Sequence, residues 1–236
     1  MAAEGPLHEL GAIGIVNSDS QGMGRIMESV RRSLQLAHVM KAWRATEGGR
    51  GHAGLPDAGA DAVDDNERVL RYLAKVTIEP AIVHGLADHV GSLRPGRLAD
   101  IVLWKPAYVG VKPEVVLKSG FAAWAPLGEG NATVERAEPT RYRPDWGGTG
   151  PAAAMLGVTF VGAAAAPAVC ERLRHGGRRV VPIGRTRGLV REDLVRNRAT
   201  VPIEIDPLDG RVTLAGRPLA VEPARELPLN RRYLLR

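Results

Sequence analysis

The sequence is short of aromatic residues, with four Trp, four Tyr and two Phe among its 236 residues. Aromatic side chains supply much of the apolar area that protein cores bury. A core in this protein must therefore be built from Ala, Val and Leu, or be completed by another surface.

Cysteine and long apolar runs are also rare. The single cysteine, Cys170, excludes a disulfide framework and a zinc cluster built on several thiolates. No apolar run approaches the roughly 20 residues that a membrane-spanning helix needs, so no membrane partner is expected. The N-terminal residues lack the basic and then apolar layout of a secretion signal. These absences predict a soluble, cytoplasmic protein.

Lysine is scarce too, because only five of the 32 basic side chains are lysines. Between Glu171 and Arg198, nine arginines and three acidic residues account for the whole formal charge of +6. A nucleic-acid surface is one interpretation of this segment. However, no aromatic residue lies between Val161 and Arg232 to stack on bases. A solvated or subunit-facing edge rich in salt bridges fits the composition better.

The rest of the composition is typical of a globular protein. Hydrophobic residues make up 44% of the chain and charged residues 25%, which excludes fibrous and wholly disordered classes. The length alone predicts one domain or two small ones.

The first 43 residues predict a strand, a polar turn and a helix. Residues 11–17 form a short apolar run bounded by glycine, which is typical of a strand. Ser18, Asp19 and Ser20 follow, with side-chain oxygens suited to a turn and a helix cap. Apolar residues at helical spacing then predict an amphipathic helix over residues 23–43. Its polar face holds Arg25, Glu28, Arg31, Arg32 and Gln35.

Two further helices and then mostly strands are predicted after this unit. Asp65 or Asn66 caps the first of these helices, Pro80 breaks or restarts it, and a shorter helix covers residues 81–90. The apolar face of the first helix comprises Val69, Leu70, Leu73 and Val76. Strands are predicted over residues 99–104, 109–117, 121–125, 179–183, 201–205, 211–214 and 219–221, with a turn at Asp209-Gly210 between two of them. One strand–helix unit cannot close a barrel, so the opening segment belongs to something larger.

Asp19 is the strongest candidate for chemistry, because it follows the predicted strand and precedes the predicted helix. In α/β barrels the loops at the C-terminal strand ends carry catalytic groups. A carboxylate there binds a metal ion or accepts a proton. The alternative is that Asp19 only caps the helix, which is worth about 1 kcal/mol. The six histidines form no HxH or HExxH pair, and each is expected to be a lone structural or surface residue.

Several long stretches of the sequence resemble the alpha subunits of ureases. Leu7–Arg25 (LHELGAIGIVNSDSQGMGR) is similar to the segment that carries the family's SSDSQAMGR motif. Asp64–Trp104, Gly110–Ala132 and Val221–Arg236 also resemble urease patterns, in the same order. The resemblance covers nearly the whole chain and is weakest over residues 143–198.

The resemblance implies a fold of the α/β plus β class. The chain would be a C-terminal fragment of a (β/α)8 amidohydrolase barrel with part of the associated β-sandwich-like composite domain. Residues 1–95 would hold the terminal strand and helices of the barrel. Residues 96–135 would hold the returning strands of the composite β domain, and residues 136–236 an Arg-rich tail of mixed strands and loops.

The resemblance also implies a part in the hydrolysis of urea to ammonia and carbamate at a dinuclear nickel site. Asp19 matches the family's aspartate nickel ligand, Gly22 the position whose backbone carbonyl contacts urea, and Met23 a methionine that lines the pocket. Two metal ions generate a nucleophile near neutral pH and polarise the carbonyl. The family's remaining metal ligands and its flap histidine have no counterpart here, so the isolated chain is expected to be inactive.

The partners that the resemblance implies are a complementary N-terminal urease alpha portion and the urease beta and gamma chains. The initial Met just upstream of the matched block suits a split gene. Two alternatives stay open: a truncated, catalytically inactive urease homologue with a structural role, and a basic nucleic-acid-binding module that uses Arg172–Arg198.

Overall fold

The computed structural model describes residues 3–18, 26–46, 49, 64–125 and 151–228. The chain divides into two compact units. The first unit comprises Met1–Ile82 and Gly188–Asn230, and the second comprises Val83–Arg187 and Arg231–Arg236. The division into residues 1–95, 96–135 and 136–236 stays a prediction. The described residues form helices and small sheets and contain no closed barrel, which fits a fragment of a barrel protein.

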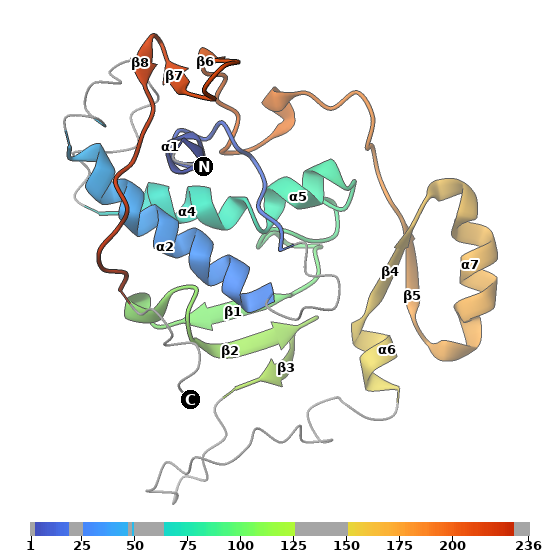
Figure 1. Cartoon of the computed structure of the whole chain (residues 1–236). Coiled ribbons are helices and arrows are strands. Elements are labelled where there is room, and N and C mark those ends of the chain that lie inside the picture. Colours follow the sequence, from blue (N-terminus) through green and yellow to red (C-terminus); the bar gives the residue numbers. More distant parts are fainter. Residues whose placement is uncertain (1–2, 19–25, 47–48, 50–63, 126–150, 229–236) are drawn as a thin grey trace, which may run out of the picture. The chain divides into compact units, whose positions relative to one another are not determined.

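The first unit is a group of helices with a small sheet supplied by the end of the chain (Figure 1). Its helices are α1 (Glu4–Glu9), α2 (Ile26–Arg44), α4 (Asn66–Ala74) and α5 (Ile78–Val83), and η5 (Arg191–Asp193) is a short 3-10 turn. The antiparallel sheet contains β6 (Ile203–Ile205), β7 (Val212–Leu214) and β8 (Arg217–Pro218). Helix α2 packs against both α1 and α4.

The apolar core of this unit joins its N-terminal helices to its C-terminal strands. Its buried members are Ala3, Leu10, Met40, Trp43, Leu214 and Leu219. Partly buried aliphatic residues of α1, α2 and the tail, such as Leu36 and Val212, pack around them. Trp43 is the one aromatic residue in this cluster. The expected shortage of aromatic core is therefore met by Leu, Val, Ala and Met side chains.

The predicted strand over residues 11–17 is wrong. Residues 12–18 have no regular structure, and residue 11 lies in a turn. A strand requires a partner strand to bond with, and none lies beside this segment in the part of the chain that the structure describes. Its backbone bonds instead to helices and tail: the amides of Ala12 and Ile13 donate to the Leu7 carbonyl at 3.0 and 3.3 Å.

The predicted helix over residues 23–43 is confirmed as α2, which is described from Ile26 onward. Its predicted polar face is only partly solvated. Arg31 and Gln35 are buried, and the Gln35 amide donates to the Pro228 carbonyl at 3.2 Å. The tail near Pro228 covers this side of α2. The spacing of residues within α2 does not reveal this contact.

The helix predicted from Asp65 or Asn66 is confirmed as α4, but its predicted face is wrong. The buried residues are Arg68, Tyr72 and Ala74, whereas Leu70 is 42% exposed. The polar side of α4 faces inward because charged partners on other segments of the chain bond to it, as described below. Of the two alternatives for Pro80, the structure has the restart. Helix α4 ends at Ala74, and Pro80 lies in the first turn of α5, where proline is tolerated because its N–H would have no helical partner. Helix α5 ends at Val83 rather than at residue 90.

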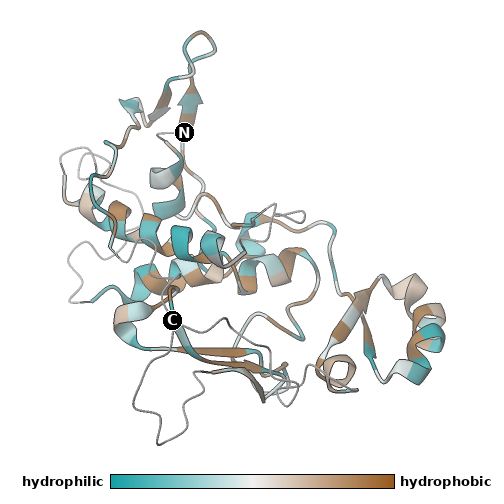
Figure 2. Ribbon diagram, turned by 60° about the horizontal axis from the view of Figure 1, so that its bottom comes forward, coloured by the Kyte–Doolittle hydropathy of each residue, from teal (hydrophilic) through white to brown (hydrophobic). Residues whose placement is uncertain are grey.

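The second unit begins with a three-stranded antiparallel meander of β1 (Ile101–Trp104), β2 (Pro113–Lys118) and β3 (Phe121–Trp124). These strands confirm the predictions over residues 99–104 and 121–125. The prediction over residues 109–117 holds only from Pro113, because residues 109–112 lie in and just after a turn. Ser119 and Gly120 both have positive φ, at 51° and 81°, as a tight hairpin between β2 and β3 requires. Figure 2 shows hydrophobic residues along these strands, and Leu103, Phe121 and Trp124 are exposed.

A parallel pair of strands joined by a helix follows. β4 (Val158–Val161) pairs in parallel with β5 (Arg179–Pro182), and α7 (Ala166–Leu173) connects them (Figure 1). The strand predicted over residues 179–183 is confirmed as β5, whereas β4 and the connecting helix were not predicted. Helix α6 (Ala152–Leu156) precedes β4. The sequence analysis did not recognise this βαβ unit because its helix begins in an alanine-rich run that carries no capping side chain.

The C-terminal strands are close to their predicted positions. β6 and β7 fall within residues 201–205 and 211–214, and Gly210 makes the predicted turn with a φ of 70°. The strand predicted over residues 219–221 is observed at Arg217–Pro218. Ala215 and Gly216 both have positive φ, so the chain reverses at once after β7 and pairs earlier than predicted.

In the part of the chain that the structure describes, no helix combines the length and the hydropathy needed to cross a membrane.

The core of the first unit predicts a large effect of one leucine. Leu214 is fully buried, so Leu214→Ala should lower the free energy of unfolding by about 2–5 kcal/mol through lost burial and a cavity. Leu208 is 95% exposed, and Leu208→Ala should change it by less than about 0.5 kcal/mol. Urea denaturation followed by circular dichroism measures both. Equal effects of the two substitutions would contradict this core.

Candidate functional site

The three residues predicted to form the site, Asp19, Gly22 and Met23, lie outside the described residues. What the structure places is the chain that leads to them, up to Ser18, and helix α2 that follows from Ile26. The candidate site is therefore built here from the surroundings of residues 11–18.

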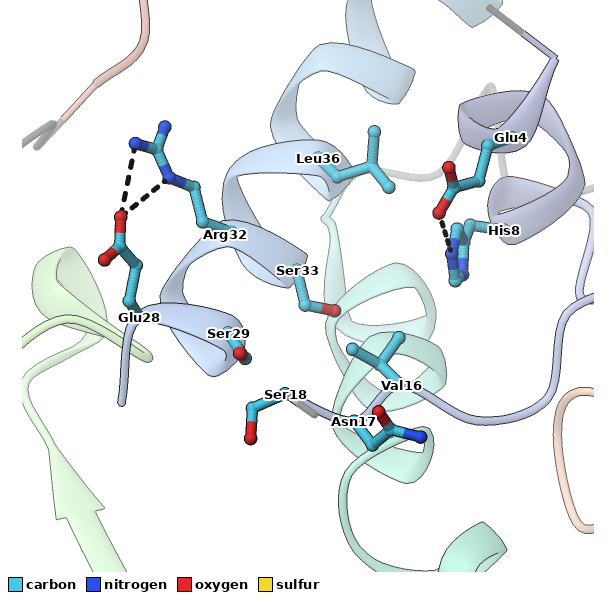
Figure 3. A pocket seen from close by; sticks show the side chains of 10 residues that line it. All are labelled: Glu4, His8, Val16, Asn17, Ser18, Glu28, Ser29, Arg32, Ser33 and Leu36. Carbon is cyan, nitrogen blue, oxygen red and sulfur yellow. Dashed lines mark hydrogen bonds and ion pairs between the residues drawn. The ribbon is translucent and has the colours of Figure 1, made fainter. Parts of the chain in front are cut away.

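A cavity of about 500 Å³ lies where the chain approaches Asp19 (Figure 3). One side is formed by Val16, Asn17 and Ser18, and the others by the beginning of α2 and by α1. The lining residues are Glu4, His8, Val16, Asn17, Ser18, Glu28, Ser29, Arg32, Ser33 and Leu36. Most of these residues are polar, although the surface that they turn toward the cavity is largely apolar.

His8 and Ser33 bring two buried polar atoms to this cavity. His8 is 5% exposed, and its Nε2 lies 3.6 Å from Glu4 Oε1. His8 Nδ1 and Ser33 Oγ have no hydrogen-bond partner within the described part of the chain. Buried polar atoms are normally bonded, so these two atoms stand out among the described residues beside the cavity.

The His8 imidazole is held in its neutral form at neutral pH. Burial lowers the pKa of His8 below its usual value, and the positive charge of Lys75 lowers it further. The Glu4 carboxylate acts in the opposite direction and is too weak to reverse the effect. A neutral imidazole has one donor and one acceptor nitrogen, so it can orient a polar neighbour without adding charge.

Three residues from elsewhere in the chain hold the backbone of the segment before Asp19 by hydrogen bonds. The Ala199 amide donates to the Gly11 carbonyl at 3.2 Å, and Arg191 Nη1 donates to the Ala12 carbonyl at 2.6 Å. The ammonium of Lys75 donates to the Ile13 carbonyl, and the amide of Val16 donates to the Lys75 carbonyl at 3.1 Å. Lys75 thus holds this segment with both its side chain and its main chain.

Lys75 belongs to a buried polar cluster that comprises Glu9, Arg68, Tyr72, Lys75, Glu79 and Asn197. All six side chains are buried, and four of them are fully inaccessible to solvent. Lys75 Nζ also donates to Asn197 Oδ1 at 2.6 Å. Arg68 Nε donates to Glu9 Oε1 at 3.0 Å, and the Tyr72 hydroxyl donates to Glu9 Oε2 at 3.3 Å. Burial beside Glu9 raises the pKa of Tyr72, so the phenol stays protonated and donates.

Glu79 connects this cluster to the tail of the chain. Its carboxylate accepts the backbone amides of Val195, Arg196 and Asn197 at 3.1, 2.9 and 3.1 Å. Asn197 Nδ2 donates to the same carboxylate at 3.3 Å and to the Arg71 carbonyl at 3.1 Å. A buried carboxylate with four donors is well satisfied, which offsets its desolvation.

The buried polar cluster was missed by the sequence prediction, although its spacing is visible. Arg68, Tyr72, Lys75 and Glu79 recur every three or four residues, which is the spacing of one helix face. The apolar residues Val69, Leu70 and Leu73 also follow helical spacing, and the prediction took them as the buried face of the helix. Only the partners Glu9 and Asn197, distant in sequence, decide which face is buried.

The described residues do not by themselves fit a dinuclear metal site. No three His, Cys, Asp or Glu side chains within them come together as a metal-binding group. Asp19, outside the described residues, would add one carboxylate. Two nickel ions each need several ligands, so one carboxylate leaves most positions to be supplied from elsewhere.

The comparisons with known proteins agree on a single family. Residues 1–123 match a model of the amidohydrolase family. The chain is 46% identical over 235 residues to urease subunit alpha 2 of Streptomyces coelicolor and to urease subunit alpha 1 of Streptomyces avermitilis. These matches cover 100% of this chain but 39% and 40% of the two relatives. The chain thus spans about two fifths of their length.

Lys75 predicts a pH dependence of stability. Burial lowers the pKa of Lys75 to about 7 in the folded chain, and the charge of Arg71 lowers it further, whereas unfolding restores its ordinary value of 10.5. Between these values the unfolded chain binds a proton that the folded chain does not. Stability should therefore rise with pH from about 7 to 10.5, by up to about 1.4 kcal/mol per pH unit.

Urea unfolding at a series of pH values measures this slope. Lys75→Met should remove the Lys75 contribution, whereas Lys105→Met, at an exposed lysine, should leave the slope unchanged. Identical slopes for the parent and Lys75→Met would show that Lys75 is not buried as described.

His8 predicts a second titration. Its pKa should lie below 6.5 when followed by NMR of the imidazole protons. Lys75→Met removes a positive neighbour, so the same pKa should rise in that variant. A His8 pKa that does not respond to Lys75 would contradict the proximity of the two groups.

Proposed function

Because the chain belongs to the amidohydrolase family, we propose that it is the C-terminal part of a urease-type enzyme that hydrolyses urea to ammonia and carbamate. The observation that supports this most is the 46% identity to two urease alpha subunits along the whole chain. A fold made of helices and small sheets without a closed barrel is in keeping with such a part.

In this proposal Asp19 is one ligand of a dinuclear nickel site, the backbone of Gly22 contacts urea, and Met23 lines the pocket. The bound metal ions would supply the activated water and polarise the urea carbonyl. The described residues of this chain contribute by holding the backbone before Asp19 in place. The carbonyls of Gly11, Ala12 and Ile13 are each bonded to a different donor, so the backbone is fixed shortly before Asp19. A ligand carboxylate needs such support to keep its geometry.

The proposed enzyme is completed by other polypeptide. The chain spans about two fifths of its relatives, and the missing donors for nickel must come from the remaining part of an alpha subunit. We further propose that urease beta and gamma chains assemble with it and that the complex acts in the cytoplasm. The cavity with His8 and Ser33 is a surface that the complementary part can contact.

Reconstitution tests this function. The full chain is combined with the part of a Streptomyces urease alpha subunit that it does not match, with the beta and gamma chains and with Ni²⁺, and ammonia release from urea is measured. Activity should appear only in the complete mixture. Asp19→Ala should lower it by at least about 100-fold, since supporting residues of metal ligands already cost 10–100-fold.

Two further variants make this test specific. Gly22→Ala should retain activity because the proposed contact is made by the main chain. Asp209→Asn removes an exposed carboxylate from the turn between β6 and β7 and should leave ammonia release unchanged. A complete mixture that assembles and binds nickel but releases no ammonia would instead establish a catalytically inactive homologue.

A further inference from the structure

A second cavity, of about 340 Å³, lies wholly within the second unit. None of its lining residues belongs to the segment that leads to Asp19. The cavity is formed by the chain before β1, the hairpin between β2 and β3, helix α6 and the start of β5. Its lining residues are Arg97, Leu98, Ala99, Ser119, Met155, Leu156, Gly157, Val158 and Arg179.

Arginines are the charged residues that line this cavity. Arg97 and Arg179 line it directly, and no acidic side chain is among its lining residues. Arg178 lies beside it, because its Nη1 is 3.3 Å from the point where a Cβ on Gly157 would stand. The nearest carboxylate along the chain, Asp100, is already bonded to Lys118 at 2.6 Å and to the Ser119 amide at 2.9 Å. The local charge is therefore strongly positive.

The three guanidinium groups have unused hydrogen-bonding capacity. Within the described residues, Arg97 donates to the Ser92 hydroxyl, and none of Arg97, Arg178 and Arg179 is in contact with a carboxylate. Guanidinium groups bind carboxylate and phosphate through paired, charge-assisted hydrogen bonds. Arg178 and Arg179 are exposed and Arg97 is half-buried, so their guanidinium groups are accessible to an anion at this cavity.

The other lining groups restrict what can bind. The Ser119 hydroxyl donates to the Leu156 carbonyl at 2.8 Å, and the amide of Gly157 donates to the Ala154 carbonyl at 3.2 Å. These groups are occupied, so the arginines are left as the donors. Leu98, Leu156 and Val158 form an apolar part of the wall. The cavity volume suits a small molecule.

We propose that this arginine-lined cavity binds the phosphate or carboxylate group of a small organic anion. The proposal assigns a role to Arg178 and Arg179, within the basic segment that the sequence singled out, whereas Arg191 and Arg196 of the same segment bond within the first unit. It does not depend on urea hydrolysis. A nucleic acid is the less favoured ligand, because no aromatic residue in the basic segment can stack on bases.

Isothermal titration calorimetry of the full chain with pyrophosphate and with citrate tests the proposal and distinguishes phosphate from carboxylate as the preferred group. Arg97→Gln and Arg179→Gln should each weaken the binding of the preferred anion about tenfold or more. Arg172→Gln removes the same charge from an exposed position on α7 outside the cavity and should change binding less than twofold.

Gly157→Ala provides a variant without a change in charge. Its added methyl group would lie 3.1 Å from the Ala153 carbonyl oxygen and 3.3 Å from Arg178 Nη1, so Arg178 must shift and binding should weaken several-fold. Circular dichroism confirms the fold of each variant. The proposal is overturned if the parent chain binds neither anion. It is equally overturned if all three arginine variants lose affinity alike, or if duplex DNA binds and the small anions do not.

Discussion

A buried ammonium group dictates much of the structure of the first unit. Lys75 is fully inaccessible to solvent, so its charge must be matched by acceptors inside the protein. Those acceptors are the Ile13 carbonyl and the Asn197 side chain, which come from opposite ends of the chain. Asn197 in turn is held by Glu79, one helical turn beyond Lys75. Breaking one contact leaves a buried charge or amide unsatisfied, which makes the three segments interdependent.

This dependence joins the tail to the candidate site. Tail residues from Arg191 to Ala199 bond to the backbone of Gly11 and Ala12 and to the carboxylate of Glu79. The same tail supplies Leu214 and Leu219 to the apolar core that α1 and α2 share. Part of the Arg-rich region thus supports the segment that leads to Asp19. Several of these contacts are made by backbone amides, which do not depend on the type of side chain.

The sequence alone was sufficient to predict elements whose pattern depends only on neighbouring residues. Helix α2, helix α4 and the meander β1–β3 follow from spacing, and the turn at Gly210 follows from its residue types. The strand expected over residues 11–17 failed because a strand depends on a neighbour that a single segment does not reveal. The prediction of the buried face of α4 was wrong for a similar reason, because Arg68 and Lys75 bond to Glu9 and Asn197, which are distant in sequence. Asp19 was singled out by its place between a predicted strand and a predicted helix, but its assignment as a metal ligand came from the resemblance. Nothing in its spacing separates a metal ligand from a helix cap.

The separation of these contacts along the chain sets an order of folding. Lys75 and Asn197 are 122 residues apart, and Glu79 reaches backbone 116 to 118 residues later. Closing such long loops costs entropy before any contact is gained, whereas β4, α7 and β5 close within a short stretch. Residues 11–16 therefore cannot make these contacts until Arg191–Ala199 have been synthesised. They thus acquire their final shape after segments that follow them in the sequence.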